Sequence, residues 1–248
     1  MTPHIAVLAG TAASLGFLHT VLGPDHYLPF IAMARSGRWS LRKTALVTLM
    51  SGFGHVASSV VLGTVGIALG TAVARLEALE ARRGTIAAWL LIAFGLTYCA
   101  WGLHRARRQG PRGHAHLHLA GIAHRHGREP AHDHDHAADG RAAGPAPAPE
   151  ASEARSMTPW ILFAVFVFGP CEPLIPLLMV PAAQSSRAGV MLVAGIFGAV
   201  TITTMLAIVL LSSYGLRLVP AARLERYAHA IAGFTIFLCG VGIQALGL

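Results

Sequence analysis

The chain has 248 residues, of which 54% are hydrophobic and only 12% are charged. Soluble globular domains carry about a quarter of their residues as Asp, Glu, Lys or Arg, so this composition excludes an ordinary soluble domain. The chain is also basic, with 19 Lys and Arg residues against 11 Asp and Glu residues. The basic residues lie near the ends of apolar runs and lack interleaved aromatic residues, which argues against a nucleic-acid-binding protein.

Six apolar runs dominate the sequence. A transmembrane helix needs roughly 20 predominantly apolar residues, and each run has that length. The runs cover residues 4–34, 44–73, 84–103, 158–182, 188–214 and 227–247. The first run has no Lys or Arg before Ile5 and continues past Pro24, so we do not expect a cleaved signal peptide. The sequence predicts an all-α integral membrane protein with six transmembrane helices.

The basic residues beside the predicted helices indicate the orientation. Those on one side are Arg35, Arg38, Arg42, Lys43, Arg105, Arg107, Arg108, Arg112, Arg155, Arg217, Arg223 and Arg226. Those on the other side are Arg75, Arg82, Arg83 and Arg187. The positive-inside rule therefore predicts a multi-pass protein of the cytoplasmic (inner) membrane, with both termini outside and the central loop in the cytoplasm.

Two similar segments indicate an internal repeat. Residues 22–29 read Leu-Gly-Pro-Asp-His-Tyr-Leu-Pro, and residues 168–176 read Phe-Gly-Pro-Cys-Glu-Pro-Leu-Ile-Pro. Each segment lies late in the first helix of a group of three, so the second group must be inverted relative to the first. The sequence thus predicts two inverted three-helix repeats, at residues 1–103 and 157–248. Chance similarity between Gly-rich helices is the alternative.

The prolines of these segments predict a break in the first helix of each repeat. Pro24 has no N–H for the carbonyl of Thr20, and it disfavours helical dihedrals at Gly23. We expect Asp25 and His26 to open a new half-helix, and Pro170 and Pro173 to break the chain around Cys171. Free backbone groups at such breaks are tolerated in a membrane only where they line a cavity, as in transporters.

The linker at residues 104–156 is the only long polar stretch. It contains His114, His116, His118, His124, His126, His132, His134 and His136. An Ala-, Pro- and Gly-rich run follows, so we expect a disordered loop that captures divalent metal ions with its imidazoles. An ordinary solvated basic linker is the alternative.

A few side chains inside the predicted helices can carry charge. Ionisable groups at bilayer depth cost about 2.5–3.5 kcal/mol each on insertion scales, so they mark a site or a pathway by default. They are His19, Asp25, His26, His55 and Glu172, with the thiol of Cys171 beside the last. Imidazole with carboxylate suits nickel, cobalt, zinc, copper or iron(II) and argues against magnesium or calcium. We predict that these residues bind a transported divalent metal, with no further cofactor.

Spacing relates these side chains to one another. In an unbroken helix His19 and His26 would lie about 20° apart on one face. Ser58 and Ser59 follow His55 by three and four residues and could orient its ring. A ligating imidazole must be neutral, so we expect metal transport to weaken as pH falls through about 6.

Residues 16–26, which read Gly-Phe-Leu-His-Thr-Val-Leu-Gly-Pro-Asp-His, resemble the first-helix signature of the nickel/cobalt transporter superfamily, including its urease-accessory-like and efflux branches. Residues 53–55, with the two serines that follow, resemble the second signature, and the His-rich loop resembles that of efflux members. The resemblance covers most of the chain outside 104–156. It implies a six-helix nickel or cobalt transporter in which His19, Asp25, His26 and His55 are essential. Uptake permeases carry an additional Asp before the Asp-His pair, which this chain lacks.

The sequence leaves other functions open besides metal transport. A membrane thiol–disulfide carrier needs paired cysteines, and Cys171 has Asp25 at the corresponding place in the first repeat. Cys99 and Cys239 are the remaining pair. An anion or sulfite exporter would need Arg or Lys deep in a helix, and we expect none there. No phosphate-binding loop or nucleophile motif indicates an enzyme. A metal-insertion factor would use the same ligands as a transporter.

Overall fold

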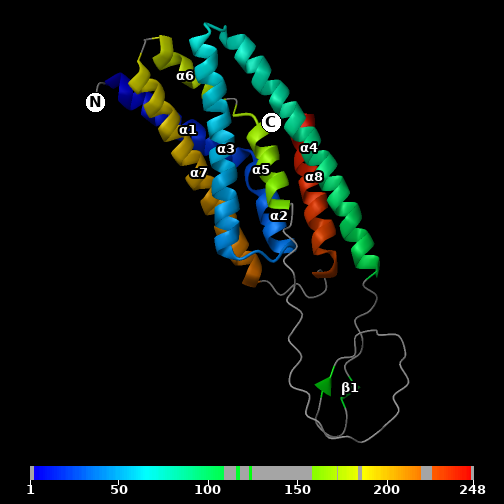
Figure 1. The fold of residues 1–248 in the computed structure, drawn as a ribbon. Coiled ribbons are helices and arrows are strands. Elements are labelled where there is room, and N and C mark those ends of the chain that lie inside the picture. Colours follow the sequence, from blue (N-terminus) through cyan, green and yellow to red (C-terminus); the bar gives the residue numbers. More distant parts are fainter. Residues whose placement is uncertain are drawn as a thin grey trace, which may run out of the picture.

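The computed structural model describes residues 3–108, 116–117, 123–124, 158–171, 173–183, 186–218 and 225–246. Over these residues the chain forms a bundle of helices (Figure 1), together with two short antiparallel strands, β1 (His116–Leu117) and β2 (Ala123–His124). The helical class is as the sequence predicts. Most of the expected disordered loop lies outside the described residues.

Five helices are long and apolar enough to cross a membrane: α1 (Pro3–Leu22), α3 (Leu41–Ala68), α4 (Val73–Arg108), α7 (Arg187–Leu218) and α8 (Ala228–Leu246), the last preceded by a 3-10 turn, η2 (Glu225–Tyr227). The fourth predicted run is instead divided into two short helices, α5 (Thr158–Phe168) and α6 (Leu174–Ala183). The chain is therefore a multi-pass helical membrane protein with five helices of spanning length among the described residues.

Both Gly-Pro segments interrupt a helix, as expected. After α1 the chain makes a 3-10 turn, η1 (Pro24–His26), and then α2 (Leu28–Ser36) begins. Asp25 and His26 thus lie within the turn, whereas the sequence analysis placed them at the start of a half-helix. The reason is local, because the N–H of His26 donates to the carbonyl of Gly23 at 3.0 Å and closes a tight turn before α2 can begin.

The third predicted helix is longer than expected at both ends. It begins at Val73 instead of residue 84 and continues to Arg108, beyond the predicted boundary at 103. A helix of 36 residues is about 54 Å long and exceeds the bilayer core of about 30 Å. Its polar first turns, including Glu80 and Arg83, therefore belong to the helix and not to a loop.

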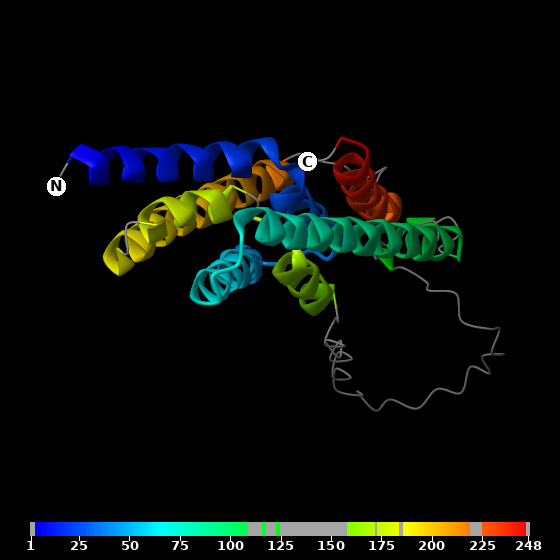
Figure 2. The same ribbon diagram turned by 90° about the horizontal axis from the view of Figure 1, so that it is seen from above.

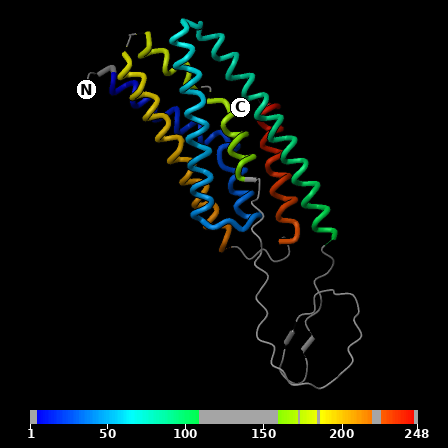
Figure 3. Tube along the Cα trace, viewed as in Figure 1, coloured from blue at the N-terminus to red at the C-terminus, as the bar shows by residue number. Residues whose placement is uncertain are grey.

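The helices pack in pairs that are distant in sequence. α1 packs along α7, α3 contacts α5, α6 and α7, and α4 packs along α8, while α2 contacts α7 and α8. The view from above separates the α4–α8 pair from the group that contains α1, α3 and α7 (Figure 2), and the Cα trace shows the same arrangement (Figure 3).

Glycines allow α4 and α8 to approach closely. A Cβ on Gly95 would overlap the backbone of Phe237, one on Gly233 would overlap Cys99, and one on Gly240 would contact Ile92. The two helices are therefore antiparallel. Cys239, next to Gly240, lies level with Ile92, which is about 10 Å along α4 from Cys99. All three cysteines are free.

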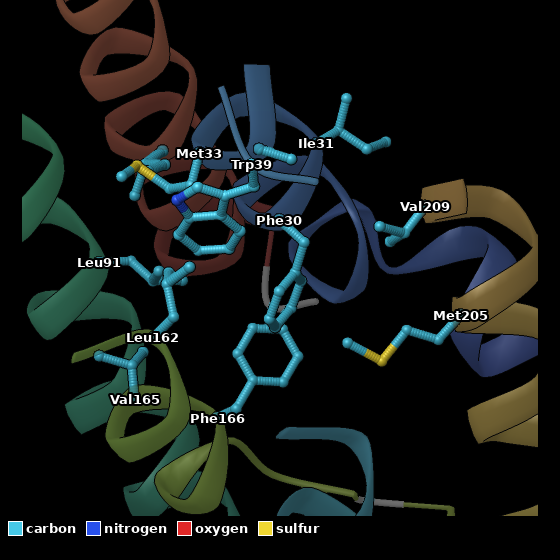
Figure 4. Packing of buried hydrophobic residues seen from close by; sticks show 12 residues of the cluster. Phe30, Ile31, Met33, Trp39, Leu91, Leu162, Val165, Phe166, Met205 and Val209 are labelled. Atoms are coloured by element: carbon cyan, nitrogen blue, oxygen red, sulfur yellow. The ribbon is translucent and has the colours of Figure 1, made fainter. Parts of the chain in front are cut away.

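Two clusters of buried apolar side chains fill the bundle. One gathers residues from α2, α5 and α7 with neighbours on α4 and α8, and Phe30 and Phe166 lie ring against ring at its centre (Figure 4), with centroids 4.6 Å apart. The other gathers residues of α1, α3, α6 and α7, including Cys171 and Phe197. Buried polar side chains lie between and beside these clusters, and they define the candidate site.

Candidate metal centre

Three imidazoles converge from three separate elements. His19 lies near the end of α1, His26 ends the η1 turn, and His55 lies in the middle of α3. The Nε2 atom of His26 is 3.1 Å from that of His19 and 3.4 Å from that of His55. Nitrogen ligands at about 2.0–2.1 Å around a tetrahedral metal ion lie about 3.3 Å apart, so these separations suit a shared cation. The three residues are the group of potential metal ligands found among the described residues.

The outer ring nitrogens have acceptors that orient two of these rings. His26 Nδ1 lies 3.2 Å from Asp25 Oδ1 and 3.1 Å from the carbonyl of Gly23. His55 Nδ1 lies 3.3 Å from the carbonyl of Phe166. A proton on each Nδ1 leaves a lone pair on each Nε2, and two facing lone pairs need a cation between them.

The ring of His55 is held differently from the way the sequence predicts. The hydroxyl of Ser58 donates to the backbone carbonyl of His55 at 2.8 Å, and both Ser58 and Ser59 accept hydrogen bonds from Arg83. Neither serine has a hydrogen bond to the imidazole in the structure. The carbonyl of Phe166 on α5 takes that role, because α3 and α5 pack together there.

The thiol of Cys171 extends the cluster. Its Sγ lies 3.7 Å from His19 Nε2, and the residue is fully buried at the break between α5 and α6. With metal–sulfur and metal–nitrogen distances of about 2.3 and 2.0 Å, tetrahedral geometry places the two ligand atoms about 3.5 Å apart. The Cys171 thiol therefore lies at ligand spacing from His19, while the ligand atoms that all lie within 4.8 Å of one another are those of the three imidazoles.

Of the two predicted carboxylate ligands, the structure describes only Asp25. Asp25 contacts the Nδ1 side of His26, away from the converging Nε2 atoms, so it orients and polarises a ligand. A cavity of about 20 Å³ beside Asp25 and His55 has the volume for roughly one water molecule. Glu172 lies outside the described residues.

Most of the predicted loop ligands also lie outside the described residues. They are His114, His118, His126, His132, His134 and His136. The backbones of His116 and His124 pair across β1 and β2, and their side chains are not described.

An ion pair that the sequence analysis missed lies against the site. Glu80 has no exposed surface, and its Oε1 lies 2.6 Å from Arg83 Nη1, whose side chain is 19% exposed. Arg83, which the expected helix boundary at residue 84 left outside the third helix, therefore lies within α4 with a largely buried side chain. Both residues seemed to belong to a loop because the polar start of α4 resembles one. The spacing of three residues between an acid and a base is the signal that could have placed them on one helix face.

This ion pair completes the hydrogen bonding of the break between α5 and α6. Arg83 donates to the carbonyls of Val167 and Gly169 near the end of α5, and Glu80 Oε2 accepts from the N–H of Cys171. Each charge thus has the sign that the adjoining helix dipole favours, positive beside carbonyls and negative beside an N–H. The pair positions Cys171 and the carbonyl that orients His55.

Aromatic rings enclose the cluster. Phe166 has its centroid 6.2 Å from that of His26 and 6.1 Å from that of His55, and Phe30 packs edge-to-face against Phe166. Phe197 of α7 lies on another side, 6.0 Å from His19. Aromatic side chains of α5 and α7 thus line two sides of the cluster.

No family model, curated protein or solved structure matches the chain. The fold and the site by themselves define its class, a multi-pass helical membrane protein with a cluster of three histidines, two of them buried.

Proposed function

We propose that the protein is a secondary transporter of divalent transition-metal ions across the cytoplasmic membrane. The observation that carries the proposal is the convergence of His19, His26 and His55 Nε2 atoms on one point inside the bundle, with Cys171 Sγ beside them. Ionisable groups are costly at this depth and persist in membrane proteins where they serve a pathway or a site. The burial of His26 and His55 suits an occluded state of a transporter.

The donor atoms favour a borderline metal ion. Imidazole nitrogens and a thiolate suit nickel, cobalt, zinc or copper, whereas magnesium and calcium prefer oxygen. The resemblance of residues 16–26 to the nickel/cobalt transporter signature favours nickel or cobalt within this group. A thiolate from Cys171 and the carboxylate of Asp25 would together offset the charge of a divalent ion.

The helix contacts support an inverted repeat with six spans. In such a repeat α1–α2 corresponds to α5–α6, α3 to α7, and α4 to α8. If the two halves are related in this way, the contact of α1 with α7 has its equivalent in the contacts of α5 and α6 with α3. The structure contains all of these contacts. The contacts of α3 with α7 and of α4 with α8 map onto themselves. With the positive-inside rule, this architecture places both termini outside and the His-rich loop in the cytoplasm.

The two competing functions find less support. A thiol–disulfide carrier needs two cysteines within bonding reach, whereas Cys99 and Cys239 lie at different levels of the α4–α8 interface. An anion exporter needs a free positive charge, whereas Arg83 is paired with Glu80.

Metal flux into proteoliposomes tests the proposal. Radiolabelled nickel and cobalt are offered with zinc and sulfite as competitors, and wild type is compared with His26→Gln, Asp25→Asn and Cys171→Ser. We expect His26→Gln to abolish metal flux, while His104→Gln, a matched change on an exposed part of α4, retains it. Absence of metal flux together with thiol transfer that depends on Cys171 would refute the proposal in favour of a redox carrier.

A further inference from the structure

One face of α3 carries a line of buried polar side chains that leads away from the metal centre. Besides His55 it contains Thr44, Thr48 and Ser51, all without exposed surface. At 100° per residue these three lie within about 40° of His55 around the helix axis. Thr44 is about 16 Å from His55 along that axis, toward the lower end of α3 in Figure 1, and the other two lie between them.

Two of these hydroxyls have no partner. Among the residues that the structure describes, the buried side-chain oxygens without a hydrogen bond are those of Thr48, Ser51 and Ser213. Other helical threonines donate to the carbonyl four residues earlier. They are Thr11, Thr20, Thr44, Thr64, Thr85, Thr97 and Thr235. Thr48 has the same option and does not take it, so its hydroxyl is available to another partner.

Ser213 belongs to the same interface. α3 and α7 are antiparallel, because Val56 lies against Gly198, and Gly52 lies against Ile202 and Met205. Moving from His55 toward Thr44 on α3 therefore corresponds to moving toward Ser213 on α7. The three unpartnered hydroxyls thus lie on the same side of the histidine cluster along the axes of α3 and α7.

Their surroundings make this arrangement unfavourable unless another molecule binds there. Met205 and Val209 of α7 are buried in the apolar cluster around Phe30 and Phe166. A buried hydroxyl without a partner in such surroundings loses the hydrogen bonds it makes in water, and the membrane offers none. The sequence could hold Val or Ala at these positions at less cost. A role for the hydroxyl oxygens explains their presence.

We propose that Thr48, Ser51 and Ser213 line the passage through which the partly hydrated metal ion moves between the histidine cluster and the lower end of the bundle. Neutral hydroxyl oxygens can replace water around a cation without holding it tightly, which a conducting passage requires. The inference rests on the proposed function, since it assigns a route to the same ion.

Isosteric replacements test the passage. Thr48→Val and Ser51→Ala remove the oxygens, and Thr97→Val, at an exposed threonine of α4, is the matched control. We expect equilibrium cobalt affinity, followed by the absorption of the bound ion, to stay within about twofold, while flux into proteoliposomes falls about tenfold in the first two variants and is unchanged in the control. Metal flux at the wild-type rate in Thr48→Val and Ser51→Ala would refute the proposed passage. Cobalt affinity that falls in parallel with flux would refute it as well.

Chemical access gives a readout that does not depend on metal transport. In the full-length protein in lipid, Thr48→Cys and Ser51→Cys should each gain one adduct with the cationic reagent 2-aminoethyl methanethiosulfonate, as counted by intact mass. Thr97→Cys should gain none, because this exposed surface of α4 faces lipid in the proposed architecture and a thiol there has no water to stabilise the reactive thiolate. Absence of adducts at both positions overturns the passage. If the adducts form but the protein transports no metal ion, the hydrated passage is supported and the proposed transport function is refuted. Failure of the passage and failure of the proposed function are therefore distinguishable.

Discussion

Replacing Arg83 with methionine tests whether the Glu80–Arg83 ion pair organises the metal centre. The substitution leaves the fully buried carboxylate of Glu80 without a counter-charge and removes the donor to Val167 O and Ser58 Oγ. Breaking a buried ion pair from one side costs about 3–5 kcal/mol. We expect the free energy of unfolding to fall by that amount.

The site should weaken together with the fold. Glu80 accepts from the N–H of Cys171, and Arg83 contacts the end of α5, whose Phe166 carbonyl faces His55. Loss of outer partners of metal ligands commonly costs about 10–100-fold in affinity, and we expect a loss of this size for cobalt. The double variant Glu80→Gln with Arg83→Met leaves no unpaired charge, so it should regain most of the lost stability.

The assay is denaturant unfolding in detergent combined with cobalt titration. Arg82→Met is the matched control, because Arg82 is the neighbouring arginine on α4 and is exposed. A loss below about 1 kcal/mol in Arg83→Met, or a double variant as unstable as the single one, would refute the role of the ion pair.

Three further predictions follow from the site. Gly23→Ala should weaken cobalt binding strongly in an absorption titration, because a Cβ at this position would lie 2.5 Å from His26 Nδ1. The control variant Gly10→Ala should bind cobalt normally, because a Cβ there contacts nothing, and equal affinities of the two variants would contradict the close approach of Gly23 to His26. Cobalt affinity should fall as the pH is lowered, because protons compete with the metal ion for each Nε2, and an affinity that stays constant until the protein unfolds in acid, measured in protein without the loop, would contradict imidazole ligation. Deleting residues 114–136 should alter apparent affinity or regulation and leave flux intact, and loss of flux at normal expression would move the site into the loop.

Much of the site could be predicted from residue types and spacing. Ionisable side chains are rare in apolar helices, so His19, His26 and His55 stand out in the sequence, and the structure brings them together. Proline has no N–H and restricts the preceding residue, so the breaks at Gly23–Pro24 and Gly169–Pro170 follow from the chain itself.

Roles that depend on neighbours could not be predicted in this way. The residue type of Asp25 indicates a metal ligand. Its carboxylate instead contacts Nδ1 of His26, on the side of the ring away from the converging Nε2 atoms, because both residues lie in the η1 turn. Ser58 and Ser59 seemed to orient His55, yet the packing of α4 against this region gives both hydroxyls to Arg83.

The sequence by itself determined a helical, multi-pass membrane protein, the positions of both helix breaks and the histidines of the site, because hydropathy, proline geometry and the cost of buried charge act locally along the chain. Only the tertiary structure decided which side chains meet. The contacts of Glu80 and Arg83 with the break between α5 and α6, and the contact of the Cys171 thiol with His19, join segments far apart in the chain. Their roles depend on helix packing, which residue spacing does not specify.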